Sequence, residues 1–398
     1  MKLNLLTQVA AATALAFAGA SAQAQIKIAN IVELSGPGTT AGTMFKNGIE
    51  MAVKEINAAG GVLGQKFEVT NMDTQTNPGV AKGLTIKAID DKAFAIFGPV
   101  YSGSILVSMA ESEKAQVPNF TGGEAASITQ KGNQYIFRTS FTQATAMPKV
   151  AKYIKDQVKA KNIAIVYVNN DFGKGGLDMI KKALAGSDTK IATEVSTEAG
   201  QVDFSSAVLK AKQSGADAVF AYTNEEESAR LLRELRKQGW TKPVIGETVL
   251  TSQKVIELAG EAANGAVAHV GLTVDAPIPA VRAYRAKFER AYGTISDHNG
   301  MKGYSGVYAL KAAIEKVGKL DRVAVAKALH TLKVTTAQEP GILMDVAFDA
   351  NGDLDRESFL TEVKGGKQVV VSTLPPLNPE NFKSAAAKPA AKAPKKSS

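Results

Sequence analysis

The chain is organised around one segment, Phe97-Gly98-Pro99-Val100-Tyr101-Ser102-Gly103-Ser104. An apolar strand over residues 93–97 runs into a turn with Gly98, Pro99 and Gly103, and a helical pattern follows at residues 105–110. Such a step points the free N–H groups of the helix's first turn, and the positive end of its dipole, into the turn. Ser102 and Ser104 add two hydroxyls. The segment therefore predicts a cradle for an anion such as a carboxylate.

An ordinary turn with a serine helix cap is the alternative interpretation of the same residues. The segment contains no acid, base or metal ligand that would point to catalysis. These eight residues alone leave both interpretations open.

The first 24 residues have the pattern of a secretory signal peptide. Lys2 supplies the positive start, residues 5–17 are rich in Ala and Leu, and Ala22-Gln23-Ala24 offers a cleavage site. We therefore expect residues 1–24 to be removed, a mature start near Gln25, and an exported protein. The chain has no cysteine, which excludes lipid anchoring, disulfides and thiol chemistry.

The positive charge is concentrated at the C-terminus. Of the formal net charge of +9, five lysines lie between Lys383 and the end of the chain, and Lys2 belongs to the signal peptide, which leaves +3 for the body. A body this mildly basic does not indicate nucleic-acid binding. The Ala/Lys/Pro composition of residues 379–398 predicts a disordered tail, and contact with an anionic membrane is its alternative role.

Strands and helices alternate along most of the chain. A first series predicts strands near 26–32, 67–71, 93–97 and 117–120, and a second, after residues 135–138, predicts strands near 163–168, 190–195, 217–222, 243–246 and 266–270. Helical patterns follow near 279–292, 302–317 and 321–332, then a strand at 342–348 and a strand pair at 359–363 and 368–371. This order predicts an α/β protein with two doubly wound parallel-sheet lobes.

The segments that resemble cofactor, metal or catalytic motifs each lack a residue that the motif requires. Gly36-x-Gly38-x-x-Ala41 lacks the acidic residue that a dinucleotide site needs about twenty residues on. The run from Asp349 to Asp355 has Leu354 where a calcium loop needs glycine. The three histidines are scattered and no nucleophile elbow is present. We expect no catalytic residue, no metal and no cofactor.

Several marks together resemble a known family. They are the cradle, Leu34-Ser35-Gly36-Pro37, Asn57-Ala58-Ala59-Gly60-Gly61, Thr129-Gln130-Lys131-Gly132, Asn170-Asp171-Phe172-Gly173, Asp203-Phe204-Ser205, the run from Leu258 to Gly265 and the run from Phe348 to Asp353. In this order, from Ile26 to about Val371, the chain resembles the type I periplasmic binding proteins of ABC transporters, in the leucine/isoleucine/valine-binding branch. The resemblance implies lobes over 26–141 with 272–350, and over 142–271 with 351–378, joined by three crossover strands.

The resemblance also implies a ligand site between the lobes. It places a ligand carboxylate on Ser102, Gly103 and Ser104, next to Tyr101, with help from the turn Gly122-Gly123-Glu124. An acidic residue on the second lobe, matched by Glu247, would meet an ammonium, and Phe172, Asn224 and Tyr304 would line the pocket.

Some positions depart from the family's pattern. Glu124 replaces a small hydroxyl residue, Phe172 replaces a tyrosine, Tyr101 stands where relatives often have a cysteine, and Ala41 replaces a bulky wall. We expect Glu124 either to pair with a ligand ammonium or to accept hydrogen bonds from a ligand amide or hydroxyl, and Glu124→Ala to change ligand choice more than folding.

The resulting hypothesis is a periplasmic substrate-binding protein of an ABC importer, not an enzyme. It would capture an amino acid or a related carboxylate by closing its lobes, and deliver it as a monomer to membrane permease subunits. A sensory module for amides or aromatic acids, which reports to a membrane partner, is the alternative. An exported α/β enzyme is a third class, for which the sequence names no catalytic group.

Overall fold

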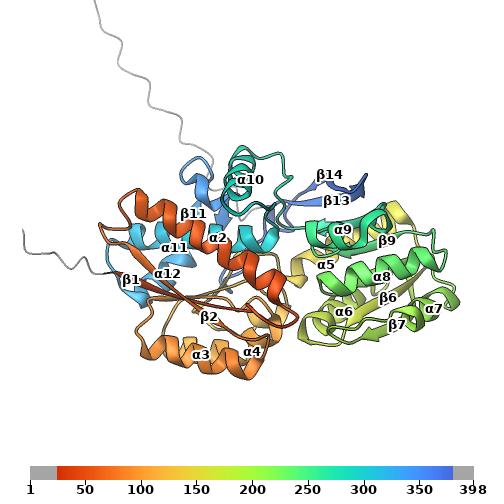
Figure 1. The fold of residues 1–398 in the computed structure, drawn as a ribbon, viewed down its shortest axis with the longest axis horizontal. Coiled ribbons are helices and arrows are strands. Elements are labelled where there is room, and N and C mark those ends of the chain that lie inside the picture. The colour runs from red at the N-terminus through yellow and green to blue at the C-terminus, as the bar shows by residue number, and fades with distance from the viewer. Residues whose placement is uncertain (1–24, 380–398) are drawn as a thin grey trace, which may run out of the picture.

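The computed structural model describes residues 25–379, which form two α/β lobes side by side (Figure 1). Each lobe has one mainly parallel sheet covered by helices. Within residues 25–379, no helix combines the length and the apolar character that a membrane crossing requires. The expected signal peptide and nearly all of the expected tail lie outside the described residues.

The first sheet has the order β2-β1-β3-β4-β5. Its strands are β1 (Ile26–Val32), β2 (Phe67–Asp73), β3 (Ala95–Phe97), β4 (Asn119–Thr121) and β5 (Ile136–Arg138), and all its pairs are parallel. The connecting helices are α2 (Thr39–Ala58), α3 (Pro78–Asp90) and α4 (Ser102–Lys114). The carboxyl ends of β1, β3 and β4 therefore lie along one edge, where α/β proteins bind ligands.

The second sheet has the order β14-β13-β10-β9-β8-β6-β7. Its strands are β6 (Asn162–Val168), β7 (Lys190–Thr197), β8 (Ala218–Tyr222), β9 (Val244–Glu247), β10 (Ala266–Val270), β13 (Ser358–Lys364) and β14 (Lys367–Leu374). Strands β6 to β10 are parallel, and the hairpin β13–β14 adds to β10 in the antiparallel sense. Its helices are α5 (Gln143–Tyr153), α6 (Asp171–Leu184), α7 (Ser205–Gln213), α8 (Glu225–Lys237) and α9 (Gln253–Ala259).

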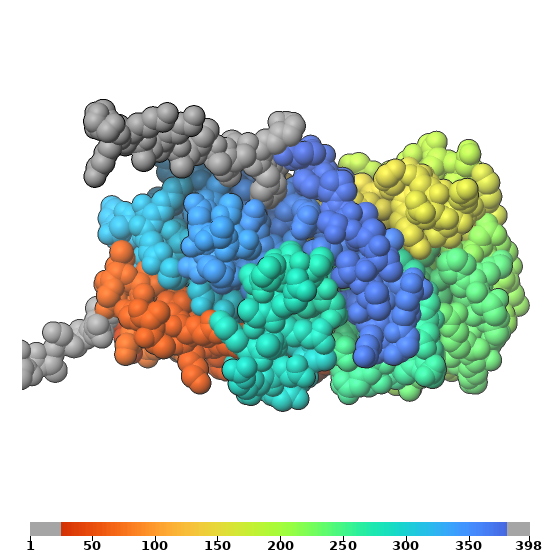
Figure 2. Space-filling view, turned by 90° about the horizontal axis from the view of Figure 1, so that it is seen from above, coloured from red at the N-terminus to blue at the C-terminus, as the bar shows by residue number. Residues whose placement is uncertain are grey.

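The chain then returns to the first lobe. Helices α10 (Pro279–Tyr292), α11 (His298–Val317) and α12 (Arg322–Leu329) follow β10, and a small antiparallel pair joins β11 (Lys333–Val334) to β12 (Val346–Ala347). Seen from above, the blue C-terminal segment runs between the cyan and orange part of the molecule and the yellow-green part (Figure 2). The last strands thus return to the second lobe, where β13 pairs with β10.

Helices α2 and α11 pack almost backbone to backbone. A Cβ atom on Gly48 would lie 2.0 Å from the carbonyl oxygen of Gly300, and one on Gly303 would lie 2.3 Å from that of Phe45. Only glycine fits such a contact, because any side chain would overlap with the facing backbone. This contact fixes the N-terminal end of α11, and with it His298, Asn299 and Lys302.

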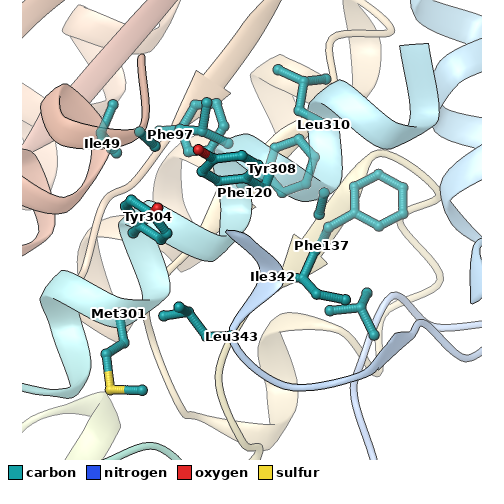
Figure 3. Close-up of a cluster of buried hydrophobic side chains, with 14 of the residues drawn as sticks. Ile49, Phe97, Phe120, Phe137, Met301, Tyr304, Tyr308, Leu310, Ile342 and Leu343 are labelled. Carbon is teal, nitrogen blue, oxygen red and sulfur yellow. The ribbon is translucent and has the colours of Figure 1, made fainter. Parts of the chain in front are cut away.

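The core of the first lobe joins its sheet to these returning helices. Phe97, Phe120 and Phe137 lie next to one another across three strands, and Phe97 and Phe120 stack at 4.9 Å. In Figure 3 these rings and the tyrosines of α11 belong to one cluster of buried side chains. The sheet end that carries the cradle therefore rests on a large apolar core.

Most element expectations are confirmed, with four main differences. Helix α11 begins at His298, before the expected start at residue 302. Helix α4 begins at Ser102 instead of Ile105, so Gly103 lies in its first turn and not in the loop. The strand expected at 342–348 is reduced to β12, because residues 340–342 form a short helical turn. Helix α9 was not expected, since it is short and follows a polar turn.

Candidate functional site

A cavity of about 270 Å³ lies between the lobes at the carboxyl ends of the strands. The first lobe lines it with Pro37, Ala41, Thr76, Pro78, Val100, Tyr101, Ser102, Gly103, Ser104, Gly122, Gly123, Glu124, His298, Asn299 and Lys302, and the second with Asn170, Asp171, Phe172, Ala199, Asn224, Glu225 and Val249. The cavity has apolar walls with a few polar groups, which is the usual composition of a small-ligand site.

The first turn of α4 forms one end of the cavity. Residues Ser102, Gly103 and Ser104 open this helix, so their N–H groups have no acceptor within it. The neighbouring loop approaches closely: the N–H of Ala125 donates to Ser102 Oγ at 3.2 Å, and a Cβ atom on Gly123 would lie 3.1 Å from the same oxygen. The two predicted turns therefore adjoin each other.

Glu33 binds the backbone of the segment that precedes α4. Its side chain is fully buried and accepts hydrogen bonds from the N–H groups of Val100 and Tyr101, each at 3.1 Å. Burial raises the pKa of this carboxyl to about 7, and the two N–H donors act in the opposite direction. Glu33 thus fixes the backbone of the two residues that lead into α4.

Arg138 holds the second turn in the same way. This fully buried side chain donates to the carbonyl oxygens of Gly123 and Ala125, and its Nε pairs with Asp353 at 2.6 Å. Glu33 therefore fixes the segment before α4, and Arg138 fixes the turn at Gly123. Both are buried ionisable side chains that do not line the cavity.

Glu124 is paired within the protein. Its Oε1 lies 2.9 Å from the Nζ atom of Lys302 on α11, and both side chains are buried. Lys302 Nζ also donates to the carbonyl oxygen of Gly122 at 3.0 Å and to Asn299 Oδ1 at 3.4 Å. Burial raises the pKa of Glu124, the nearby Glu247 raises it further, and Lys302 opposes both.

Glu247 is not part of the cavity lining, but it is close enough to Glu124 to raise the pKa of that carboxyl. Its Oε1 accepts from Thr248 at 2.6 Å and lies 3.2 Å from His269 Nδ1, and His269 Nε2 lies 2.9 Å from Ser358. Burial raises the pKa of Glu247 and lowers that of His269 to about 3. The group expected to meet a ligand ammonium therefore lies outside the lining, with Oε1 in an internal network and Oε2 without a hydrogen-bond partner among the described residues.

The second lobe contributes an aromatic wall and a free donor. Phe172 stacks on Tyr222 at 4.2 Å, and Gln143 donates to both the Phe172 carbonyl and the Tyr222 hydroxyl. Asn224 lies at the start of α8, caps nothing with its side chain, and keeps a buried Nδ2 without a partner among the described residues. A donor in this position is available to an acceptor in the cavity.

The structure brings together most of the residues that the sequence predicted. Tyr101, Ser102, Gly103, Ser104, Gly122, Gly123, Glu124, Phe172 and Asn224 all line the cavity. Tyr304 does not: its ring packs against Tyr284 and Tyr308 in the core, and its hydroxyl donates to Glu55 at 2.6 Å. Figure 3 shows Tyr304 among the buried apolar side chains. Its assignment to the pocket wall was wrong, because Tyr304 lies on the face of α11 that packs in the core.

Lys302 is the main residue that the sequence analysis missed. It lies between Met301 and Gly303 in the first turns of α11, among small and apolar residues, and a lysine in a buried setting needs a partner. Asn299, His298, Asp171 and Glu225 were also missed, since each begins or adjoins a helix in a way that ordinary capping explains. Among residues 25–379 no three His, Cys, Asp or Glu side chains are grouped to hold a metal ion.

Comparisons with known proteins agree on one family. The model of the family described as "Periplasmic binding protein" matches residues 25–394. The Leu/Ile/Val-binding protein homolog 3 of Brucella melitensis is 31% identical over 369 residues, which are 90% of this chain and 96% of that protein.

Solved structures have the same fold. A branched-chain amino acid transporter substrate-binding protein from Streptococcus pneumoniae, in complex with isoleucine, has a TM-score of 0.81 at 23% identity and covers 89% of this chain and 100% of its own. An ABC transporter solute-binding protein from R. palustris, in complex with benzoate, has a TM-score of 0.81 at 21% identity. The match covers 89% of this chain and 97% of that protein. The chain belongs to the type I periplasmic binding proteins, in the family of the leucine/isoleucine/valine-binding proteins.

Proposed function

We propose that this protein is the periplasmic substrate-binding protein of an ABC importer, and that it captures a small carboxylate-bearing solute in the cavity between its lobes. One observation supports this proposal most strongly: hydrogen-bond donors from both lobes belong to residues that line the same cavity. They are the free N–H groups at the start of α4 and, on the opposite lobe, Asn224 Nδ2, an atom without a partner within residues 25–379. Donors from both lobes would hold one ligand, so the ligand would favour the closed arrangement. The role is binding and delivery rather than catalysis.

The carboxylate would lie on the N–H groups of Ser102, Gly103 and Ser104. Hydrogen bonds to a charged acceptor contribute about 1.5–3 kcal/mol each, and the helix dipole adds to them. The half-buried Phe172 and the apolar side chains of Val100, Ala41 and Val249 would contact the rest of the ligand. Permease subunits in the membrane are the proposed partners, and the protein is proposed to act as a monomer in the periplasm.

Native mass spectrometry of the purified mature protein tests this proposal first, because a tightly bound solute is retained through purification. A thermal-shift screen of amino acids, amides and aromatic acids follows, since a ligand that binds the folded state raises the Tm. We expect at least one carboxylate to raise the Tm and to reduce the radius of gyration in solution scattering. A flat response to all classes would contradict a binding role, and turnover of a bound compound would favour an enzyme.

A further inference from the structure

The place beside the carboxylate cradle is already occupied by a positive charge of the protein. In an α-amino acid the ammonium is attached to the carbon that carries the carboxylate, so its acceptors must lie next to the carboxylate site. Here two buried acceptors adjoin the cradle, the Gly122 carbonyl and the Glu124 carboxylate, and both bind Lys302 Nζ, at 3.0 and 2.9 Å.

Lys302 uses its full hydrogen-bonding capacity in this position. An ammonium has three N–H donors, and Nζ has three acceptors: Gly122 O, Glu124 Oε1 and, at 3.4 Å, Asn299 Oδ1. Only 2% of the Lys302 side chain is exposed, and 7% of that of Glu124. The pair is thus a fixed part of the cavity floor. A second cation placed there would meet a like charge, and it would compete with Lys302 for Gly122 O and Glu124 Oε1.

We propose that the Lys302 ammonium takes the place of a ligand ammonium, so that the cavity selects carboxylic acids without an α-amino group. This inference rests on the proposed function and names the class of solute. The carboxylate would lie on the start of α4, close to the Lys302 charge. An acceptor at the far end of the ligand, such as a hydroxyl or carbonyl oxygen, would bind Asn224 Nδ2.

The remaining acids of the lining offer a weaker ammonium site. Burial raises the pKa of Glu225 to about 8, so this carboxyl is mostly protonated at neutral pH. Asp171 lies beside the cradle, since a Cβ atom on Gly103 would be 2.9 Å from its Oδ2, but its side chain is exposed and water screens its charge. Glu247 is bound to Thr248 and His269 outside the lining. None of these three combines charge, burial and access to the cavity.

Matched pairs of ligands test this selectivity, because each pair differs only in the α-ammonium. Isothermal titration of the mature protein would compare isocaproate with leucine, and hydrocinnamate with phenylalanine. We expect each deaminated acid to bind at least about tenfold more tightly than its amino acid. Tighter binding of the amino acids would overturn this inference and leave the proposed function intact. Failure of every solute class to bind would overturn the proposed function, and this inference with it.

Substitution of Lys302 adds a second readout. Lys302→Ala frees Gly122 O and Glu124 for a ligand ammonium, so leucine should gain at least about tenfold relative to isocaproate. If this variant does not fold, Lys302→Ala/Glu124→Gln removes both charges, and it should bind leucine and isocaproate within a few-fold of each other. Lys316→Ala, on the exposed end of the same helix, is the matched control and should keep the wild-type preference. An unchanged preference in the Lys302 variants would overturn the inference.

Discussion

The Nζ atom of Lys302 lies 2.9 Å from Oε1 of Glu124, and this pair joins helix α11 to the loop after β4 beneath the cavity. The expectation that Glu124→Ala changes ligand choice more than folding assumed a turn residue that contributes little to the core, whereas Glu124 is buried and paired with Lys302. Glu124 neutralises a buried cation, so its removal affects the stability of the lobe as well.

We predict that Glu124→Ala lowers the free energy of unfolding by about 3–5 kcal/mol, because it leaves Lys302 buried without its partner. Urea denaturation of the ligand-free protein measures this change. Asp91→Ala removes the exposed partner of Lys87, a pair 2.7 Å apart, and should change stability by less than about 1 kcal/mol. Equal effects of the two substitutions would contradict the buried role of Glu124.

We predict that Asn224→Ala separates binding from stability. Its Nδ2 has no partner among the described residues, so the ligand-free variant should unfold within about 0.5 kcal/mol of the wild type, while the Kd for the ligand rises about twofold to tenfold. Calorimetric titration and urea unfolding give the two quantities. Asp321→Ala is the contrasting variant, since Asp321 caps α12 through the N–H of Ala324: it should lose about 1 kcal/mol of stability and keep the Kd.

We predict that Glu33 makes stability fall as the pH rises. Its pKa is about 7 in the folded protein against 4.5 for the free side chain, so between these values the folded state holds more protons than the unfolded chain. The stabilisation is complete below pH 4.5 and is lost as the pH rises to about 7. The loss should reach about 3 kcal/mol in total, because each pH unit in this window costs up to about 1.4 kcal/mol.

Glu33→Gln isolates that contribution. The variant keeps the size of the side chain but cannot ionise, so its stability curve should be flatter than that of the wild type between pH 4.5 and about 7. Glu225 and other buried acids remain in both proteins, and the difference between the two curves removes their effect. Parallel curves from urea unfolding at several pH values would show that Glu33 has no raised pKa.

We predict that the contact between α2 and α11 tolerates no side chain. Gly48→Ala would place a Cβ atom 2.0 Å from the Gly300 carbonyl oxygen, and the overlap should cost about 1–3 kcal/mol or more. Gly83→Ala, inside α3 with no described atom within 4 Å of its Cβ position, should stabilise the protein by about 0.5–1 kcal/mol. Thermal unfolding of both variants checks the prediction, and a stabilised Gly48→Ala variant would contradict the packing described for α11.

The fold class and much of the cavity follow from local sequence. Apolar strands that alternate with helices must form sheets covered by helices, and the turn before α4 must point free N–H groups outward. Nine of the eleven residues expected in the site line the cavity. The local pattern predicted the cradle itself, and the resemblance to the family supplied the second turn, Phe172 and Asn224.

Which charges meet depends on tertiary packing. Lys302 is 178 residues from Glu124 along the chain, and their contact depends on the glycine packing of α11 against α2, which no local pattern encodes. The same packing places Tyr304, two residues further on, in the core instead of the cavity. Local sequence sets backbone conformation over short range, whereas the partner of a buried charge is set by how separate helices and loops pack together.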